Sequence, residues 1–136
     1  MTDREIINYI PILIYGLEYN PAIGLQTFGV SYCNKSTIEF TNYTEEEIVN
    51  KGFDFFKEFI HPDDLHKIPQ TLTMLQNSNL NEQYEFFRVK VKNKDNYILM
   101  RIFFKKISPV QKNEIIKFVV TSLNASPEEI VKHYSN

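Results

Sequence analysis

The last third of the sequence restricts the fold most, because it predicts three long β-strands in close succession. The three segments are 84–92, 97–107 and 115–123, each rich in β-branched and aromatic residues and separated from the next by polar residues. In the middle segment every second residue from Ile98 to Phe104 is apolar, whereas the alternate positions include Arg101 and Lys105. A strand with this pattern buries one face fully and the other only in part. The sequence therefore predicts an antiparallel meander with an apolar inner face.

The same alternation predicts which side chains point inward and which point outward. We expect these apolar residues on the inner face: Phe87, Val89, Val91, Ile98, Met100, Ile102, Phe104, Ile116, Phe118 and Val120. The outer face keeps apolar residues between its lysines: Phe86, Leu99, Phe103, Ile115 and Val119. An outer apolar patch of this kind commonly marks a contact surface.

The first third of the chain predicts a hairpin. Asp3 can cap a helix over 3–10, which carries Ile6 and Ile10 on one side and ends at a proline. Strands are expected over 12–19 and 25–33, joined by a turn that contains proline and glycine.

Short helices follow the hairpin. Asn34 and Thr44 are expected to be helix N-caps, and Thr44 with Glu47 forms a capping-box pattern. The run His61-Pro62-Asp63-Asp64 is typical of another helix start, and Pro69 is expected to kink or split the helix that follows, near Ile68. Two strands, several short helices and three strands together predict an α+β fold in which helices cover one face of an antiparallel sheet.

Composition limits the class of protein. The chain has 136 residues, 43% of them hydrophobic, which suits one domain with a buried core, and its net charge of -2 argues against binding to nucleic acid or to an anionic membrane. The apolar stretch 6–17 is interrupted and too short to span a bilayer, and the first residues lack the features of a signal peptide, so we expect a cytoplasmic protein. Cys33 has no second cysteine with which to form a disulfide or a zinc site.

Catalytic motifs give no support for an enzyme. The sequence contains no GxSxG, no GxGxxG and no P-loop, and His133 has no identifiable partner. His61 lies beside Asp63 and Asp64, but a helix N-terminus explains these residues better than an acid–base or metal site. We therefore predict neither catalytic residues nor metal ligands.

Four stretches of sequence, taken in order, resemble a known family. They are 30–35 (VSYCNK), 40–48 (FTNYTEEEI), 60–65 (IHPDDL) and 87–95 (FRVKVKNKD). Their order and spacing resemble a Per-Arnt-Sim (PAS) sensor domain over residues 11–124. Asn42 and Asn96 stand where the family usually has glycine. These are mild departures from the family pattern, because asparagine tolerates positive φ. The family's closing "DIT" motif often couples the sensor to a downstream helix. In this sequence residues 120–123 (VTSL) stand in its place.

This resemblance implies a five-stranded antiparallel sheet in the order 2-1-5-4-3 and a role in signal transduction without catalysis. Haem-binding members take their iron ligand from the helical region that contains His66, but at a position nearer Pro69, so no haem is expected. Flavin-binding light sensors use a cysteine on a central helix, whereas Cys33 ends a strand, so no flavin is expected. Cys33 is interpreted as a small buried apolar residue.

The resemblance also implies a pocket enclosed by helices, which can bind a small apolar ligand unless core side chains fill it. The residues expected to line it are Phe40, Phe56, Phe59, Leu72, Leu75, Met100, Ile102 and Phe118. The expected interface of a homodimer, or with another signalling domain, comprises Ile6, Ile10, Phe86, Leu99, Phe103, Ile115 and Val119.

The basic run Lys90, Lys92, Lys94, Lys105 and Lys106 is interpreted as the solvated side of two strands, because nucleic-acid binding needs an aromatic or arginine element beside it. The expected parts are a cap helix at 1–10, a PAS domain of the bacterial type at 11–124 and a helical extension at 125–136. An enzyme or carrier with a cone-shaped apolar α+β pocket is the alternative, and it would require convergent buried acids and histidines.

Overall fold

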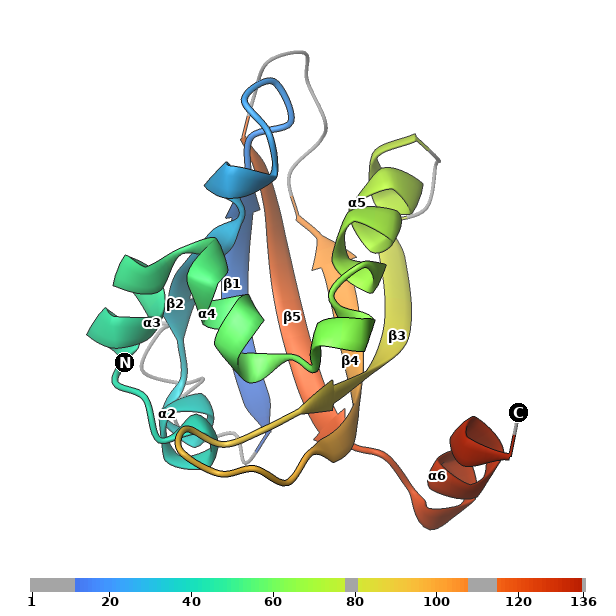
Figure 1. Cartoon of the computed structure of the whole chain (residues 1–136). Coiled ribbons are helices and arrows are strands. Elements are labelled where there is room, and N and C mark those ends of the chain that lie inside the picture. The colour runs from blue at the N-terminus through green and yellow to red at the C-terminus, as the bar shows by residue number, and fades with distance from the viewer. Residues whose placement is uncertain (1–11, 78–80, 108–114, 136) are drawn as a thin grey trace.

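The computed structural model describes residues 12–77, 81–107 and 115–135. One antiparallel sheet runs through the molecule, and the helices α2 to α5 lie along one of its faces (Figure 1). The strands are β1 (Leu13–Tyr19), β2 (Gly29–Cys33), β3 (Glu82–Val89), β4 (Ile98–Lys106) and β5 (Ile116–Asn124). Their order is β2-β1-β5-β4-β3, as the family resemblance implies. β5 therefore lies at the centre, between β4 and β1 from the other end of the chain.

The helices between β2 and β3 are short, and most of them begin at the expected caps. They are α2 (Lys35–Thr41), α3 (Glu45–Lys51), α4 (Phe53–Phe59), the 3-10 turn η2 (Pro62–Asp64) and α5 (Lys67–Asn77). The Asn34 side chain caps α2, and Thr44 forms the expected capping box with Glu47 at the start of α3. A last helix, α6 (Pro127–Tyr134), begins with a second capping box, between Ser126 and Glu129.

Several expected boundaries are wrong, among them the end of the strand expected over 84–92, which stops at Val89. The second strand begins at Gly29 and not at residue 25, because the 3-10 turn η1 (Leu25–Thr27) precedes it and Gly24, at φ 128°, breaks the extended backbone. The helical break before α5 falls at Leu65 and His66, earlier than predicted. Pro69 then lies in the first turn of α5, where its missing N–H group removes no helical hydrogen bond.

The core forms between the inner face of the sheet and the helices. The predicted inward residues Phe87, Met100, Ile102, Phe118 and Val120 are each at most 2% exposed, which confirms the alternation. Ile98 is an exception at 38% exposed, because it begins β4 at the rim of the sheet. Val91 is another, since β3 ends at Val89 and Val91 is only partly buried. The cap helix expected over 3–10 lies outside the described residues.

Candidate functional site

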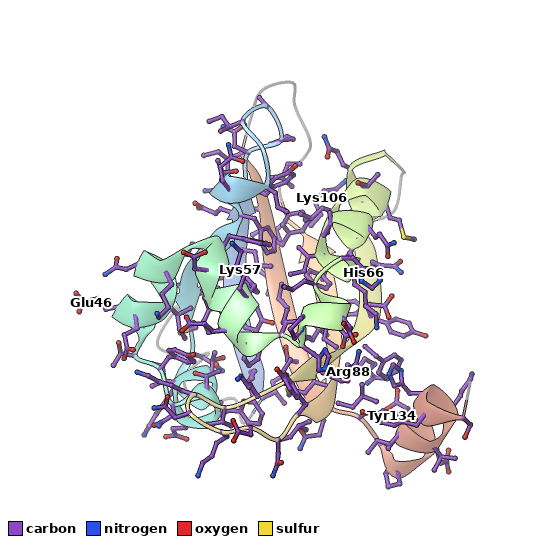
Figure 2. All side chains as sticks on the ribbon, in the orientation of Figure 1. Glu46, Lys57, His66, Arg88, Lys106 and Tyr134 are labelled. Carbon is purple, nitrogen blue, oxygen red and sulfur yellow. The ribbon has the colours of Figure 1, made fainter. Side chains whose placement is uncertain are left out.

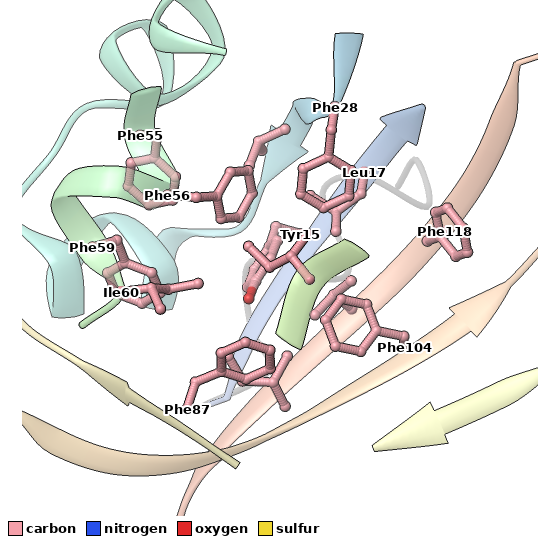
Figure 3. Packing of buried hydrophobic residues seen from close by; sticks show 14 of the residues in the cluster. Tyr15, Leu17, Phe28, Phe55, Phe56, Phe59, Ile60, Phe87, Phe104 and Phe118 are labelled. Carbon is pink, nitrogen blue, oxygen red and sulfur yellow. The ribbon is translucent and has the colours of Figure 1, made fainter. Parts of the chain in front are cut away.

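The candidate site is the space between the helices and the sheet, and phenylalanine rings fill it (Figure 3). The ring centroids of Phe28 and Phe56 are 4.9 Å apart, and those of Phe55 and Phe59 are 5.1 Å apart. Tyr43 meets Phe55 edge-on at 5.5 Å. These separations are those of rings in direct contact, so the place where a pocket was expected contains a packed aromatic core.

The residues expected to line the pocket come from three parts of the chain and gather in this core. Seven are at most 3% exposed: Phe56, Phe59, Leu72, Leu75, Met100, Ile102 and Phe118. Phe40 is only partly buried and packs against the same cluster. Ligand binding by these residues remains a prediction, since burial alone describes a core as well as a filled pocket.

Two hydroxyl groups on the inner face of the sheet escaped sequence reasoning. The Tyr15 hydroxyl lies 3.2 Å from that of Ser122, and either can donate the hydrogen bond. Burial raises the pKa of Tyr15 to about 12, although its hydrogen bond with Ser122 opposes the shift. The pair is therefore neutral at physiological pH. Ser122 follows Phe118 and Val120 at two-residue spacing, so strand parity alone could have placed it inward.

The candidate residues His61, His66 and Cys33 lie on different elements of the structure. His61 Nδ1 accepts a hydrogen bond of 3.0 Å from the backbone N–H of Asp63, so His61 caps the turn as the helix-start interpretation predicts. His66 is exposed in the turn before α5. Cys33 is 4% exposed, as expected for a small core residue, and its backbone N–H donates to Glu45. Over the described ranges, no three histidine, cysteine or acidic side chains lie together as metal ligands would.

Asp64 is a buried carboxylate that ties η2 to the edge strand β3. It accepts hydrogen bonds from the backbone N–H of Arg88 at 2.8 Å and from the guanidinium Nε and Nη2 atoms at 3.0 and 2.8 Å. Burial by itself would raise the pKa of Asp64, but these hydrogen bonds and the nearby Lys67 outweigh it and hold the pKa below its usual range. Figure 2 labels Arg88 beside the helices. Asp64 and Arg88 form a structural clamp.

The outer face of the sheet keeps apolar side chains, as predicted. Phe86, Phe103 and Val119 are half-buried there, and Ile115 is 47% exposed. Leu99 differs from the expectation of an accessible patch, since it is only 5% exposed. The chain leaving β5 passes beside it, where the Ala125 N–H donates to the Leu99 carbonyl at 3.0 Å. Ile6 and Ile10 lie outside the described residues.

A shallow hollow occupies the middle of this outer face. Its volume is about 300 Å³, and it is lined by Tyr84, Arg101, Phe103, Thr121 and Leu123. Tyr84 and Leu123 are 55% and 40% exposed and extend the apolar surface beyond the residues predicted from sequence. α6 reaches its rim, where Glu129 lies 3.6 Å from Arg101.

The basic run divides into two groups, which corrects its interpretation as one solvated sheet surface. Lys105 is on β4 and pairs with Glu82 at 3.5 Å, and Lys106 donates to the Leu75 carbonyl. Lys90, Lys92 and Lys94 follow β3, which ends at Val89, and they belong to the β3–β4 connection. They lie beside Tyr43 and Tyr97, and so the aromatic element missing from the sequence pattern is present in space.

Comparison with protein families identifies one match. The model of a family described as the PAS fold matches residues 30–122, which run from β2 to β5 and leave out β1. No curated protein matches the sequence. Among the described residues, no helix is long and apolar enough to cross a membrane.

Solved structures with the same fold are distant in sequence. A PAS domain from Colwellia psychrerythraea has a TM-score of 0.67 at 12% identity, over 89% of this chain and 92% of that chain. A domain of a putative light and redox sensing histidine kinase from Haloarcula marismortui has a TM-score of 0.60 at 14% identity, over 83% and 90%. The PAS-B domain of Drosophila melanogaster Cycle, solved with ethylene glycol bound, has a TM-score of 0.59 at 12% identity, over 82% and 99%. At these identities the similarity establishes the fold alone.

Proposed function

This chain belongs to the PAS family, and from that premise we propose that it is a non-catalytic sensory and interaction domain in signal transduction. The family match over residues 30–122 carries this proposal, since PAS domains are sensor modules of signalling proteins. The buried carboxylate of the described residues is Asp64, which Arg88 neutralises, and the Tyr15–Ser122 pair is neutral. A core of this chemistry supports sensing or partner binding over the alternative of an enzyme.

The interior and the outer face point to different modes of action. In the core the phenylalanine rings contact one another, so an apolar ligand could enter only by displacing them. The outer face, in contrast, presents the partly exposed side chains of Phe103, Val119 and Tyr84. The proposed primary mode is therefore protein contact through the outer sheet face, with a second copy of the chain as the partner. The proposed domain spans residues 11–124, flanked by a cap segment at 1–10 and an extension at 125–136, and it acts in the cytoplasm.

Sedimentation of the purified protein tests the contact. Val119 is half-buried on the outer face, so Val119→Glu places a charge in the proposed interface and is expected to give a folded monomer where the unaltered chain is a dimer. Val49→Glu is the matched control, because Val49 is 37% exposed on α3, on the helical side of the molecule. A monomeric unaltered chain at high concentration, or a Val119→Glu dimer, would contradict the homodimer.

Native mass spectrometry tests the interior separately. A small molecule that stays bound through purification would favour ligand sensing, and its loss in a variant with an enlarged side chain at Leu75, which is fully buried, would locate it in the core. A bound molecule unaffected by that change would place it elsewhere.

A further inference from the structure

A polar hollow with a volume of about 580 Å³ lies between α4 and the β3–β4 connection, where Tyr43 separates it from the aromatic core. Small-molecule sites in proteins commonly have volumes of about 300–1,000 Å³. Four lysines contribute to its lining: Lys57 on α4, labelled in Figure 2, and Lys90, Lys92 and Lys94 on the connection. The hollow has the size of a ligand site and a predominantly cationic lining.

Backbone hydrogen bonds hold the connection in place. The N–H of Lys90 donates to the Phe59 carbonyl at 2.9 Å, and that of Lys92 donates to the Thr41 carbonyl at 3.0 Å. The N–H of Lys94 closes a turn onto the Val91 carbonyl at 3.1 Å. The backbone that carries the three lysines is therefore hydrogen-bonded to the ends of α2 and α4.

Two tyrosine rings position the ammonium groups. Lys92 Nζ lies 5.1 Å from the ring centroid of Tyr43, and Lys90 Nζ lies 5.8 Å from that of Tyr97. Distances below about 6 Å allow cation–π attraction. The Tyr97 ring also packs against His61, at 4.6 Å between centroids, and forms part of the lining. The hollow thus combines cationic groups with an aromatic wall.

The ion pairs around the hollow leave part of its positive charge unbalanced. Lys92 is paired with Glu47 at 2.7 Å, and Glu58 is paired with Lys51 at 3.0 Å, so these charges cancel. Among the residues that the structure describes, neither Lys90 nor Lys94 forms an ion pair within 4.0 Å. Asp95 is the remaining carboxylate of the lining. The two lysines can therefore accept an anionic ligand without first breaking an ion pair.

From this arrangement we infer that the hollow binds a small organic phosphate, with Lys90 and Lys94 at the phosphate and Tyr97 beside the organic part. Lysine binds phosphate as a compact point charge, which suits two lysines that line one hollow from the same connection. The net charge of -2 on the whole chain disfavours a long polyanion, which would extend beyond the hollow, and favours a small molecule that fits inside it.

Calorimetric titration of the full chain with AMP tests the inference. Lys90→Gln and Lys94→Gln are each expected to weaken AMP binding about tenfold, the usual effect of losing one charge-assisted hydrogen bond. The matched control is Lys105→Gln, which removes the same charge from a lysine of the same basic run that pairs with Glu82 on the outer face. Its affinity for AMP is expected to equal that of the unaltered chain.

Three results would overturn the inference. The first is the absence of saturable AMP binding at millimolar concentration, and the second is an equal loss of affinity in the Lys105→Gln control, which would indicate non-specific attraction. The third is tighter binding of a single-stranded oligonucleotide than of AMP, which would indicate a nucleic-acid surface. Adenosine, which lacks the phosphate, should not bind, and inorganic phosphate should bind more weakly than AMP. Circular dichroism of each variant establishes that it is folded.

Discussion

Asp64→Asn keeps the shape of the side chain and removes the charge on which the clamp between η2 and β3 depends. Asp64 is 3% exposed, and its two oxygens accept three hydrogen bonds from Arg88. Asparagine supplies one acceptor oxygen, and its amide group would oppose the guanidinium. The variant therefore leaves Arg88 in place without its counter-charge, and it also leaves Lys67, 4.0 Å from the carboxylate, less well compensated.

The expected cost is large relative to the stability of a small domain. Removing one member of a buried ion pair costs about 3–5 kcal/mol. The Arg88 side chain is 26% exposed, so water recovers part of its solvation, and we expect a loss in the free energy of unfolding near the lower limit, about 3 kcal/mol. Urea unfolding followed by circular dichroism measures this loss. Asp63→Asn is the control, because the Asp63 side chain is 78% exposed and its loss should change stability by at most about 0.5 kcal/mol. Equal effects of the two variants would refute the clamp.

The pH dependence of stability gives an independent test of the same group. The pKa of Asp64 is lower in the folded chain than its usual value, so the unfolded chain binds the proton more tightly. The stabilisation from the carboxylate is complete above the unfolded pKa of about 3.9 and is lost as the pH falls through the lower folded value. Asp64→Asn should therefore make the stability less dependent on pH below about pH 4. If the variant loses stability below about pH 4 as steeply as the unaltered chain does, Asp64 is not the group responsible for that loss.

Substitutions at four further positions test the capping, packing and turn assignments. Asn34→Ala should lower the free energy of unfolding by about 3 kcal/mol, because buried Asn34 forms hydrogen bonds with Ile12, Ile14 and Thr37. Thr44 is exposed, so Thr44→Ala should cost about 1 kcal/mol. Equal losses in urea unfolding would argue against this difference. Phe56→Ala should cost about 4 kcal/mol and open an apolar cavity, so that benzene raises the melting temperature of the variant more than that of the unaltered chain. Asn42→Gly should preserve or raise the melting temperature, because Asn42 has φ 63° at the end of α2, whereas Asn42→Ala should lower it.

Local patterns predicted the elements whose structure depends on neighbours in sequence. The alternation from Met100 to Phe104 placed β4 correctly, because inward and outward positions repeat every two residues whatever the rest of the chain does. The caps at Asn34 and Thr44 are also local, since each side chain bonds a backbone N–H three residues later. The two asparagines that stand at family glycine positions show the limit of this reasoning. Asn42 adopts positive φ as expected, but in the β3–β4 connection the residue with positive φ is Asn93 and not Asn96.

The residues of the aromatic core could be predicted from the sequence, but whether they enclose a pocket could not. Sequence reasoning gathered Phe56, Phe59 and Leu72 into one interior, and the structure places all three there. Whether that interior is hollow depends on how closely rings from different elements approach, for example Phe28 from the end of η1 against Phe56 from α4. No spacing along the chain encodes a distance of this kind.

The cationic hollow lay beyond sequence reasoning because strand parity does not reveal where a strand changes its partner. Lys90, Lys92 and Lys94 continue the alternation of β3, and so they read as the solvated side of a longer strand. In the structure β3 leaves β4 after the pair of Val89 with Ile98, and its backbone turns to the helices instead: the His61 N–H donates to the Arg88 carbonyl at 2.8 Å. The Lys90 N–H then bonds the Phe59 carbonyl, so the lysines that follow lie against α4. The Asp64–Arg88 clamp also holds η2 beside β3, so the lysines are placed by contacts between residues far apart in sequence, 24 positions in the case of the clamp.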